Sequence, residues 1–194
     1  MESDVSTTTT SRDPAPGQLQ LVQDFVNTLD VETGTDELAD ADALGAWFSQ
    51  RELLEPSEPL SGPDLDCARS FREALRTLLD GHAHGSERED ALRVLNGVPS
   101  GVVLRVAFDE SGAPRLEPAS GDGVDRALAR LLAIIDRAAA DGSWARLKVC
   151  ADDGCRWAFY DHSRNRSGSW CSMAVCGNRA KARNYRERQR TSEG

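Results

Sequence analysis

The chain has 194 residues, 39% of them hydrophobic and 28% charged, and a formal net charge of −9 at pH 7. This length allows one domain of ordinary size with a smaller module attached. No internal repeat and no apolar run of membrane length is present, and residues 1–17 lack the basic and apolar stretches of a secretory signal. We therefore expect a cytoplasmic protein that has no membrane partner and begins with a disordered tail.

Charge and cysteine are both unevenly distributed along the chain. Residues 1–140 carry 12 Lys and Arg against 26 Asp and Glu, a formal charge of −14, whereas residues 141–194 carry 11 against 6, a charge of +5. Four of the five cysteines lie in the last 45 residues. In a reducing cytoplasm, clustered cysteines more often hold a metal than form disulfides. An acidic body with a basic, cysteine-rich end predicts a module that binds a polyanion.

The acidic part is predicted to be mainly helical. In LQLVQDFVNTL, residues 19–29, apolar side chains recur at the three- and four-residue intervals of an amphipathic helix. The proline-rich segment EPSEPLSGP, residues 55–63, is predicted to be a connection. Further helices are predicted at about 40–50, at 64–80, at 125–140 and, after a capping box formed by Ser86 and Glu89, around Leu92 and Leu95.

A change of period at residues 102–118 predicts a β-hairpin. The segments VVLRVAF and PRLEP are typical of strands and flank a turn around residues 110–112. A hairpin of this size needs cover, which the apolar helix at 125–140 is expected to supply. The predicted fold class is α+β, mainly α, with a disordered tail at 1–17, a helical domain at 18–142 and a C-terminal module at 143–194.

The four clustered cysteines have the spacing C-x4-C-x15-C-x4-C and are Cys150, Cys155, Cys171 and Cys176. Two close pairs joined by a loop suit tetrahedral Zn(II), because each pair supplies two thiolates from one local turn. Two disulfides or four free thiols are the alternatives, but the segment has too little apolar mass to fold alone. The sequence therefore predicts one structural Zn(II) per chain.

Residues next to each cysteine pair support this interpretation. Gly154 is expected to let the first pair turn tightly, so that backbone amides point at the thiolates. Ser172 is a good N-cap, so the second pair should lie at the start of the final helix. The positive end of that helix favours thiolate over thiol.

The other cysteine and the histidines are not expected to be primary ligands. Cys67 lies on the apolar side of a predicted helix, where a small buried hydrophobe is expected. His82 and His84 are predicted to lie in a solvated loop. His162, between the two cysteine pairs, is a candidate for a neighbour of the metal site or for a phosphate contact.

Basic residues recur along the final helix. If the helix begins near Ser172, the intervals of four, three and four residues place Arg179, Arg183, Arg186 and Arg190 in one stripe. A charge run is usually a solvated face, but only one acid interrupts six basic residues here, so neutralisation within the helix is poor. A narrow apolar seam of Val175, Ala182 and Tyr185 is expected beside the stripe. The helix is expected to dock on the zinc core through its small residues and to expose much of its charge.

A basic helix of this kind fits the major groove of DNA. Asn178 and Arg179 are residue types that read adenine and guanine, although either could instead cap the helix, brace the zinc loop or bind phosphate. The loop YDHSRNRSGSW, residues 160–170, adds further groups capable of phosphate contact. The predicted nucleic-acid contacts are Arg164, Arg166, Asn178, Arg179, Lys181, Arg183, Arg186 and Arg190.

The sequence resembles two known families. Residues 147–190 resemble the CGNR zinc finger, named for the run that stands here as Cys176, Gly177, Asn178 and Arg179. The segments LVQDFVNTLD and FREALRTLLDG resemble the ABATE domain, which commonly precedes this finger in bacterial proteins grouped as stress-induced transcription regulators. The resemblance implies a treble-clef-like finger with zinc on the four clustered cysteines, and DNA binding through that finger.

The leading hypothesis is a DNA-binding transcription regulator that acts on double-stranded DNA at the nucleoid. Its acidic domain is expected to sense a small-molecule effector or to mediate formation of a homodimer. A zinc-stabilised module that binds RNA or a protein is the alternative. We do not expect an enzyme, because the sequence has no glycine-rich phosphate loop and no convincing Ser/His/Asp set, and because four thiolates leave zinc no open position.

Overall fold

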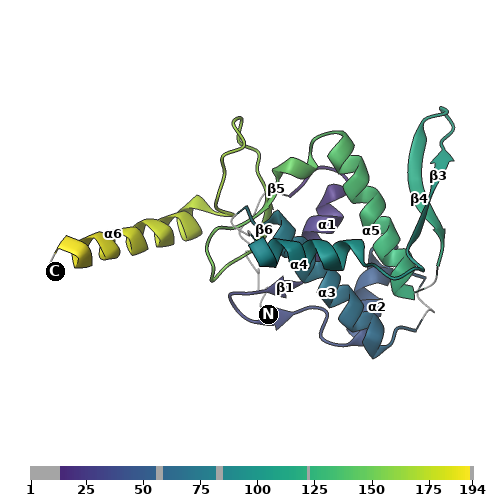
Figure 1. Ribbon diagram of the computed structural model, residues 1–194, viewed down its shortest axis with the longest axis horizontal. Coiled ribbons are helices and arrows are strands. Elements are labelled where there is room, and N and C mark those ends of the chain that lie inside the picture. Colours follow the sequence, from purple (N-terminus) through teal and green to yellow (C-terminus); the bar gives the residue numbers. More distant parts are fainter. Residues whose placement is uncertain (1–13, 56–58, 82–84, 122, 193–194) are drawn as a thin grey trace, which may run out of the picture.

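The computed structural model describes residues 14–55, 59–81, 85–121 and 123–192 (Figure 1). Most of the predicted disordered tail, together with His82 and His84, lies outside these residues. Folded structure begins before residue 18, because Ala15 is buried with 3% exposure and its backbone N–H donates to Oε1 of Gln23 at 2.6 Å. None of the described helices is both long and apolar enough to cross a membrane.

The fold is α+β and mainly helical, as predicted. The predicted helices are present with small shifts at their ends, as α1 (Leu19–Val26), α2 (Ala41–Gln50), α3 (Gly62–Leu79), α4 (Gly85–Asn96) and α5 (Gly123–Ala140). Side chains cap two of them. Asp40 accepts from the N–H of Ala43 at the start of α2, and Ser61 and Asp64 form a capping box on α3.

Aromatic rings from three helices form the centre of the core. Phe25 of α1 lies 5.6 to 6.3 Å, between ring centroids, from Trp47 and Phe48 of α2 and from Phe71 of α3. Leu128 and Leu131 of α5 are fully buried in the same cluster. Burial of each such side chain contributes roughly 1.5 to 3 kcal/mol relative to its exposure, so these helices fold as one body.

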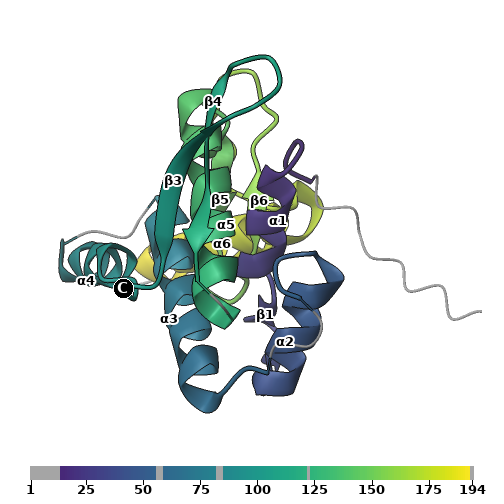
Figure 2. The ribbon, with the colours of Figure 1, turned by 90° about the vertical axis from the view of Figure 1, so that its right-hand side faces the viewer.

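The predicted β-hairpin consists of β3 (Val103–Phe108) and β4 (Pro114–Ser120), paired antiparallel. Asp109 closes its turn by accepting from the N–H groups of Ser111 and Ala113, and Gly112 takes the left-handed conformation that the turn requires (φ 82). The hairpin runs beside α5 and stands at the end of the molecule opposite the C-terminus (Figures 1 and 2). Helix α5 therefore covers part of the hairpin, and Val106 and Phe108 stay exposed.

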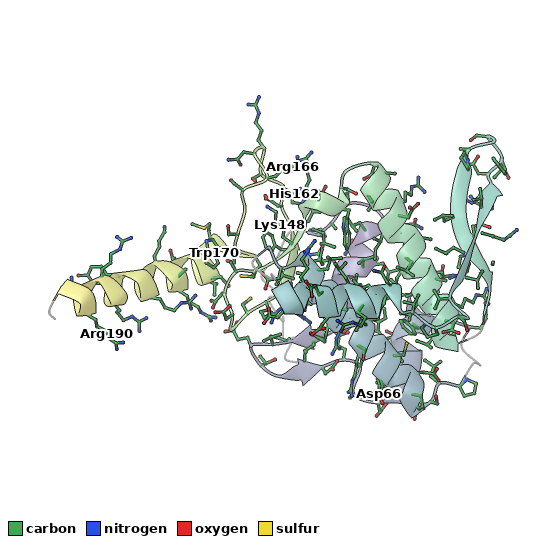
Figure 3. All side chains as sticks on the ribbon, in the orientation of Figure 1. Asp66, Lys148, His162, Arg166, Trp170 and Arg190 are labelled. Atoms are coloured by element: carbon green, nitrogen blue, oxygen red, sulfur yellow. The ribbon has the colours of Figure 1, made fainter. Side chains whose placement is uncertain are left out.

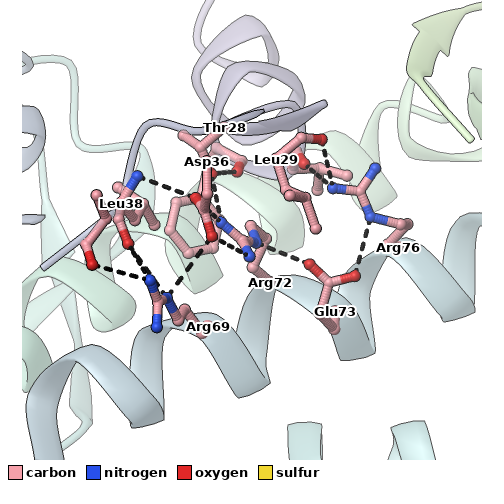
Figure 4. Close-up of polar contacts among 11 residues, drawn as sticks. Thr28, Leu29, Asp36, Leu38, Arg69, Arg72, Glu73 and Arg76 are labelled. Atoms are coloured by element: carbon pink, nitrogen blue, oxygen red, sulfur yellow. Dashed lines mark hydrogen bonds and ion pairs between the residues drawn. The ribbon is translucent and has the colours of Figure 1, made fainter. Parts of the chain in front are cut away.

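A second hairpin, β1 (Leu29–Asp30) with β2 (Thr35–Asp36), is held by arginines of α3 (Figure 4). Arg72 is 2% exposed and binds both carboxylate oxygens of Asp36, at 2.7 and 3.0 Å. Arg76 is 1% exposed and donates to the carbonyl oxygens of Val26 and Leu29. Arg72 thus ties β2 to α3 through its carboxylate partner, and Arg76 pairs backbone carbonyls at the end of α1 and in β1.

The C-terminal module begins with a short 3-10 helix at Trp144–Arg146, followed by a third hairpin, β5 (Leu147–Val149) with β6 (Ala158–Tyr160). A π-helical turn at Met173–Gly177 leads into α6 (Asn178–Ser192). Leu147, Val149 and Ala158 are buried in the core of the helical domain. The first half of the module therefore shares its core with the domain before it.

Two side chains, one in α1 and one at its C-cap, bind the backbone of β6. Asn27 accepts from the N–H of Ala158 at 2.8 Å and donates from Nδ2 to the carbonyl oxygen of the same residue at 2.9 Å. Gln23 donates to that carbonyl at 3.2 Å. The amide of Asn27 thus pairs with β6 as a neighbouring strand would.

Candidate metal centre and nucleic-acid interface

The four clustered cysteines converge at one point. The sulfur atoms of Cys150, Cys155, Cys171 and Cys176 all lie within 4.8 Å of one another. The Sγ atoms of Cys155 and Cys171 are 3.6 Å apart, and those of Cys171 and Cys176 are 3.7 Å apart. Tetrahedral Zn(II) with Zn–S bonds of about 2.3 Å requires sulfur atoms about 3.8 Å apart. The donor set therefore fits one zinc ion per chain.

The first pair of cysteines lies in the connection between β5 and β6. Backbone N–H groups point at their sulfurs, from Asp152 to Cys150 and from Trp157 to Cys155. Such hydrogen bonds stabilise thiolates and fix the first coordination turn. The chain turns at Gly154 as expected, because the N–H groups of Cys155 and Arg156 donate to the carbonyl oxygen of Asp152 at 2.7 and 3.0 Å. Arg156, directly after Cys155, takes the left-handed conformation (φ 48).

The second pair lies where the final helix starts, as predicted. The hydroxyl of Ser172 accepts from the backbone N–H of Val175 at 3.3 Å, which makes Ser172 the N-cap of the π-helical turn. Cys176 lies within that turn and is fully buried, and α6 begins two residues later. Its thiolate therefore lies at the positive end of a helix, where negative charge is favoured.

The four thiols cannot all lose their protons unless a cation balances them. The pKa of Cys150 is lowered because the thiol of Cys155 donates to it, and the same contact raises the pKa of Cys155. The pKa of Cys171 is raised by its contact with Cys150, and that of Cys176 is raised mainly by burial. One thiolate therefore suppresses the others, and a bound dication is what stabilises all four.

Asp152 is a functional residue that the sequence analysis missed. Its side chain is 3% exposed beside the first cysteine pair, and its Oδ1 accepts from Nη1 of Arg183 at 3.1 Å. Its backbone carbonyl accepts from the N–H of Cys155 at 2.7 Å. Asp152 therefore connects the metal turn to the basic helix, a contact across 31 residues that cysteine spacing does not reveal.

Asp161 organises the loop between the two cysteine pairs. Its carboxylate is 3% exposed and accepts from Nζ of Lys148 at 2.7 Å, from the N–H of Ser163 at 3.0 Å and from the N–H of Gly168 at 2.8 Å. A Cβ on Gly168 would lie 2.8 Å from Oδ1 of Asp161, so glycine is needed there. The loop carries exposed Arg166 away from the body (Figure 3).

Helix α6 projects from the body rather than packing against it (Figure 1). The predicted apolar seam is not covered, because Val175 is 39% exposed, Tyr185 is 65% exposed and Ala182 is also exposed. Within the part of α6 whose side chains are described, only Ala180 is buried. The predicted stripe is therefore carried on an arm, with Arg190 near its end (Figure 3).

Acids from outside α6 neutralise the first half of the stripe. Nη2 of Arg179 lies 2.6 Å from Oε1 of Glu32, in the β1–β2 connection, and Arg183 pairs with Asp152. The side-chain amide of Asn178 donates to the carbonyl oxygen of Ala174 at 2.9 Å. Asn178 therefore contacts the π-helical turn that holds Cys176, and Arg179 contacts the acidic domain.

The second half of α6 and the preceding loop remain exposed. Arg186 donates from Nε to the carbonyl oxygen of Ala182, within its own helix. None of the ion pairs among the described residues involves the remaining predicted contacts, which are Arg164, Arg166, Lys181, Arg186 and Arg190. These exposed cations, rather than the whole stripe, are the groups available to a polyanion.

His162 and Cys67 are not part of the sulfur cluster. Nε2 of the exposed His162 lies 3.3 Å from the carbonyl oxygen of Pro14, and its ring packs against Tyr160. Cys67 lies on α3, partly buried against the core, where burial raises its pKa. Its packing agrees with the prediction of a small hydrophobe.

Two families match the chain over adjacent ranges. Residues 146–189 match the CGNR zinc finger, and residues 19–142 match the ABATE domain, whose family is described as "Putative stress-induced transcription regulator". No curated protein matches the chain. The first range contains all four sulfur ligands, and the second contains the helical core. With an ABATE domain over most of its length and a CGNR zinc finger after it, the chain belongs to the ABATE family of regulators.

Proposed function

We propose that this protein regulates transcription by binding double-stranded DNA through its zinc finger. The observation that carries the proposal is the arm formed by α6, which extends exposed cations away from an acidic body. Residues 141–194 have a formal charge of +5, against −14 for residues 1–140. Long-range repulsion by the body directs a polyanion toward the arm. Such a regulator acts in the cytoplasm, at the nucleoid.

The zinc centre has a structural role in this proposal. The metal, when bound, neutralises four thiolates and fixes the turn from which α6 starts. Asp152 and Arg183 then join that turn to the first helical residues, so the direction of α6 is set by the metal site. Four protein ligands leave zinc no open position for a substrate, which supports a regulator rather than an enzyme.

Phosphate contacts account for most of the expected affinity. Arg164, Arg166, Lys181, Arg186 and Arg190 can each neutralise one phosphate. Five such contacts predict a slope of about −4.5 for log affinity against log salt concentration on duplex DNA. Because Arg179 is engaged by Glu32, base recognition by Arg179 requires that this ion pair open first.

The test begins with genomic DNA fragments recovered by the purified, zinc-loaded protein. On the best fragment, Arg186→Ala and Arg190→Ala should each make the salt slope shallower by about 0.9. Arg93→Ala is the matched control, because Arg93 is an exposed helical arginine on α4 of the acidic domain. Unchanged slopes in both arm variants would refute DNA binding by this arm. Equal affinity for an RNA duplex of the same sequence would refute a preference for double-stranded DNA.

The acidic domain is assigned the sensing role in this proposal, with homodimer formation as its other role. Support for sensing comes from the continuity between the two parts: α5 ends at Ala140 and the first zinc ligand is Cys150. The end of α5 is therefore ten residues from the first zinc ligand, so a shift of that end can reach the metal turn. The oligomeric state follows from sedimentation of the zinc-loaded chain.

A further inference from the structure

A cleft of about 610 Å³ lies between the β3–β4 hairpin, α5 and the chain that follows α2. Its volume falls within the range of roughly 300 to 1,000 Å³ that small-molecule sites occupy. All its lining residues belong to the acidic domain, and the β3–β4 hairpin that forms one side of it stands at the end of the molecule away from α6 (Figure 1). The metal centre and the basic arm do not contribute to it.

One wall of the cleft is apolar. In the hairpin register, Val106 lies opposite Leu116 and Phe108 lies opposite Pro114. Residues directly opposite each other share a face of the sheet, so these four side chains form one apolar face. Leu116 and Pro114 line the cleft, whereas Val106 is 61% exposed and Phe108 is 68% exposed. This much exposed apolar surface indicates a contact that the isolated chain does not make.

The floor of the cleft is one face of α5. Three residues that line the cleft follow Arg130 by three, four and seven positions, so all four lie on the same side of the helix. They are Ala133, Ile134 and Arg137. The two arginines are separated by about two helical turns, or about 10 Å. Apolar side chains therefore lie between two guanidinium groups along the floor.

Guanidinium groups gather at this cleft in a part of the chain that is otherwise strongly acidic. Four of the 12 basic residues of positions 1–140 line it, against three acids, Glu52, Asp109 and Asp136. Asp109 is already occupied by hydrogen bonds from Ser111 and Ala113. The local balance of charge is therefore positive, although the region as a whole carries −14.

Most of these guanidinium groups lack a carboxylate partner. No ion pair among the described residues involves Arg51, Arg130 or Arg137. Arg51 lies 4.0 Å over the ring of Trp47, and Arg130 donates to the backbone carbonyl of Glu52. Both contacts hold the side chain in place without a carboxylate at ion-pair distance, and Asp24 and Asp141 act on Arg51 and Arg137 only from farther away. Arginine held in this way suits a carboxylate or a similar planar anion.

We propose that this cleft binds a small organic anion with an apolar body, such as an aromatic or acyl carboxylate. The anionic head contacts Arg137 at one end of the floor, and the apolar body lies against Ile134 of the floor and Leu116 of the hairpin. This cleft is the place where the acidic domain senses its effector, and the organic anion is that effector, so the role of the cleft in regulation rests on the function proposed above. Binding itself is measured without DNA, and either proposal can therefore fail alone.

The test uses the full, zinc-loaded chain and the probe 8-anilinonaphthalene-1-sulfonate, an aromatic anion whose fluorescence rises in apolar sites. One saturable site is expected. Arg137→Gln should weaken the probe about tenfold, which corresponds to the loss of about 1.4 kcal/mol. Arg126→Gln is the matched control, since Arg126 lies on α5 outside the cleft, and it should leave the affinity unchanged. Leu116→Asp, which places a negative charge on the hairpin wall, should also weaken the probe.

Competition identifies the ligand class. 1-Naphthoate should displace the probe, whereas acetate, which has no apolar body, and dodecyltrimethylammonium, which has the opposite charge, should not. Because the probe also binds partly unfolded protein, each variant must keep the wild-type unfolding midpoint. Equal probe affinity in Arg137→Gln and Arg126→Gln, or equal displacement by the cationic amphiphile, would overturn the proposal. Either result would mean that the probe binds an apolar surface that does not select for negative charge.

Discussion

Arg179 of the basic arm and Glu32 of the acidic domain form an ion pair, with Nη2 and Oε1 separated by 2.6 Å. The two residues are 147 positions apart in the chain, and both side chains are partly exposed. The acidic domain therefore occupies one of the arginines that the sequence assigned to DNA. The carboxylate of Glu32 and a DNA phosphate therefore compete for the guanidinium group of Arg179.

Replacing Glu32 should strengthen DNA binding. Glu32→Gln removes the competing charge and releases Arg179, so one further phosphate contact makes the salt slope steeper by about 0.9. The measurement is a salt titration on the selected fragment, with Glu37→Gln as control, because Glu37 carries the same charge beyond the hairpin. Equal salt slopes for the wild type and Glu32→Gln would mean that Arg179 makes no phosphate contact even when the carboxylate of Glu32 is removed.

Loss of one sulfur ligand should remove the metal. Cys155→Ser is expected to reduce zinc from one atom per chain to none by metal analysis, since structural zinc contributes on the order of 10 kcal/mol of apparent folding free energy in small fingers. Because β5 and β6 share the main core, thermal unfolding of the helical domain should also occur at a lower temperature. Cys67→Ser, outside the cluster, should keep its zinc. Full zinc content in Cys155→Ser would contradict the assigned ligand set.

Asn27 should be more important for stability than its polar character suggests. Asn27→Ala leaves the N–H of Ala158 buried without its acceptor, at a cost of about 1 to 3 kcal/mol in the free energy of unfolding. The carbonyl keeps its bond from Gln23. Urea denaturation measures the effect, and Asn178→Ala, which changes an exposed asparagine, should cost less than about 0.5 kcal/mol. Similar midpoints for the two variants would show that Asn27 does not hold β6.

Asp161 should make the finger sensitive to acid. Burial alone would raise the pKa of Asp161, but the hydrogen bond from Lys148 and those from Ser163 and Gly168 outweigh it and hold the pKa well below its usual value. The pKa of Asp161 is lower in the folded chain than in the unfolded chain, where it is about 3.9. Ionisation of Asp161 therefore stabilises the folded state above about pH 3.9, and this stabilisation is lost as the pH falls toward the pKa of the folded state. Asp161→Asn should therefore be less stable than wild type at pH 7, and the difference should shrink below pH 4. If urea denaturation gave the same difference in unfolding free energy between wild type and Asp161→Asn at every pH in this range, the ionised carboxylate would not be the source of the stabilisation.

The sequence predicted the elements whose signal is local. Apolar periodicity identified α1 to α5, and alternation with a turn identified β3 and β4, because each pattern reports burial of one face. The four cysteines were also predictable, since spacing and thiol chemistry together leave few alternatives. Ser172 shows that even a single cap can be read when its chemistry is specific.

The features that the sequence did not predict depend on partners distant in the chain. Strands β1 and β2 have two residues each, and they are stabilised by Arg72 and its neighbours more than 30 positions later. Exposure of the apolar seam around Tyr185 was not predicted, because periodicity identifies a helix face but does not say whether anything covers it. In the same way, Arg179 and Arg183 could not be known to face acids, since Glu32 and Asp152 lie 147 and 31 residues away.

The pairing of Asn27 with Ala158 limits how freely the two halves of this protein can be recombined. A finger joined to its host only by a linker could be exchanged between regulators during evolution or in the laboratory. Here the host domain inserts a side-chain amide where a strand would lie, and the finger contributes three buried residues to the host core. A chimera must therefore inherit both partners of this pairing, and a crossover at the boundary near residue 142 would separate them. The natural unit of exchange is the whole chain.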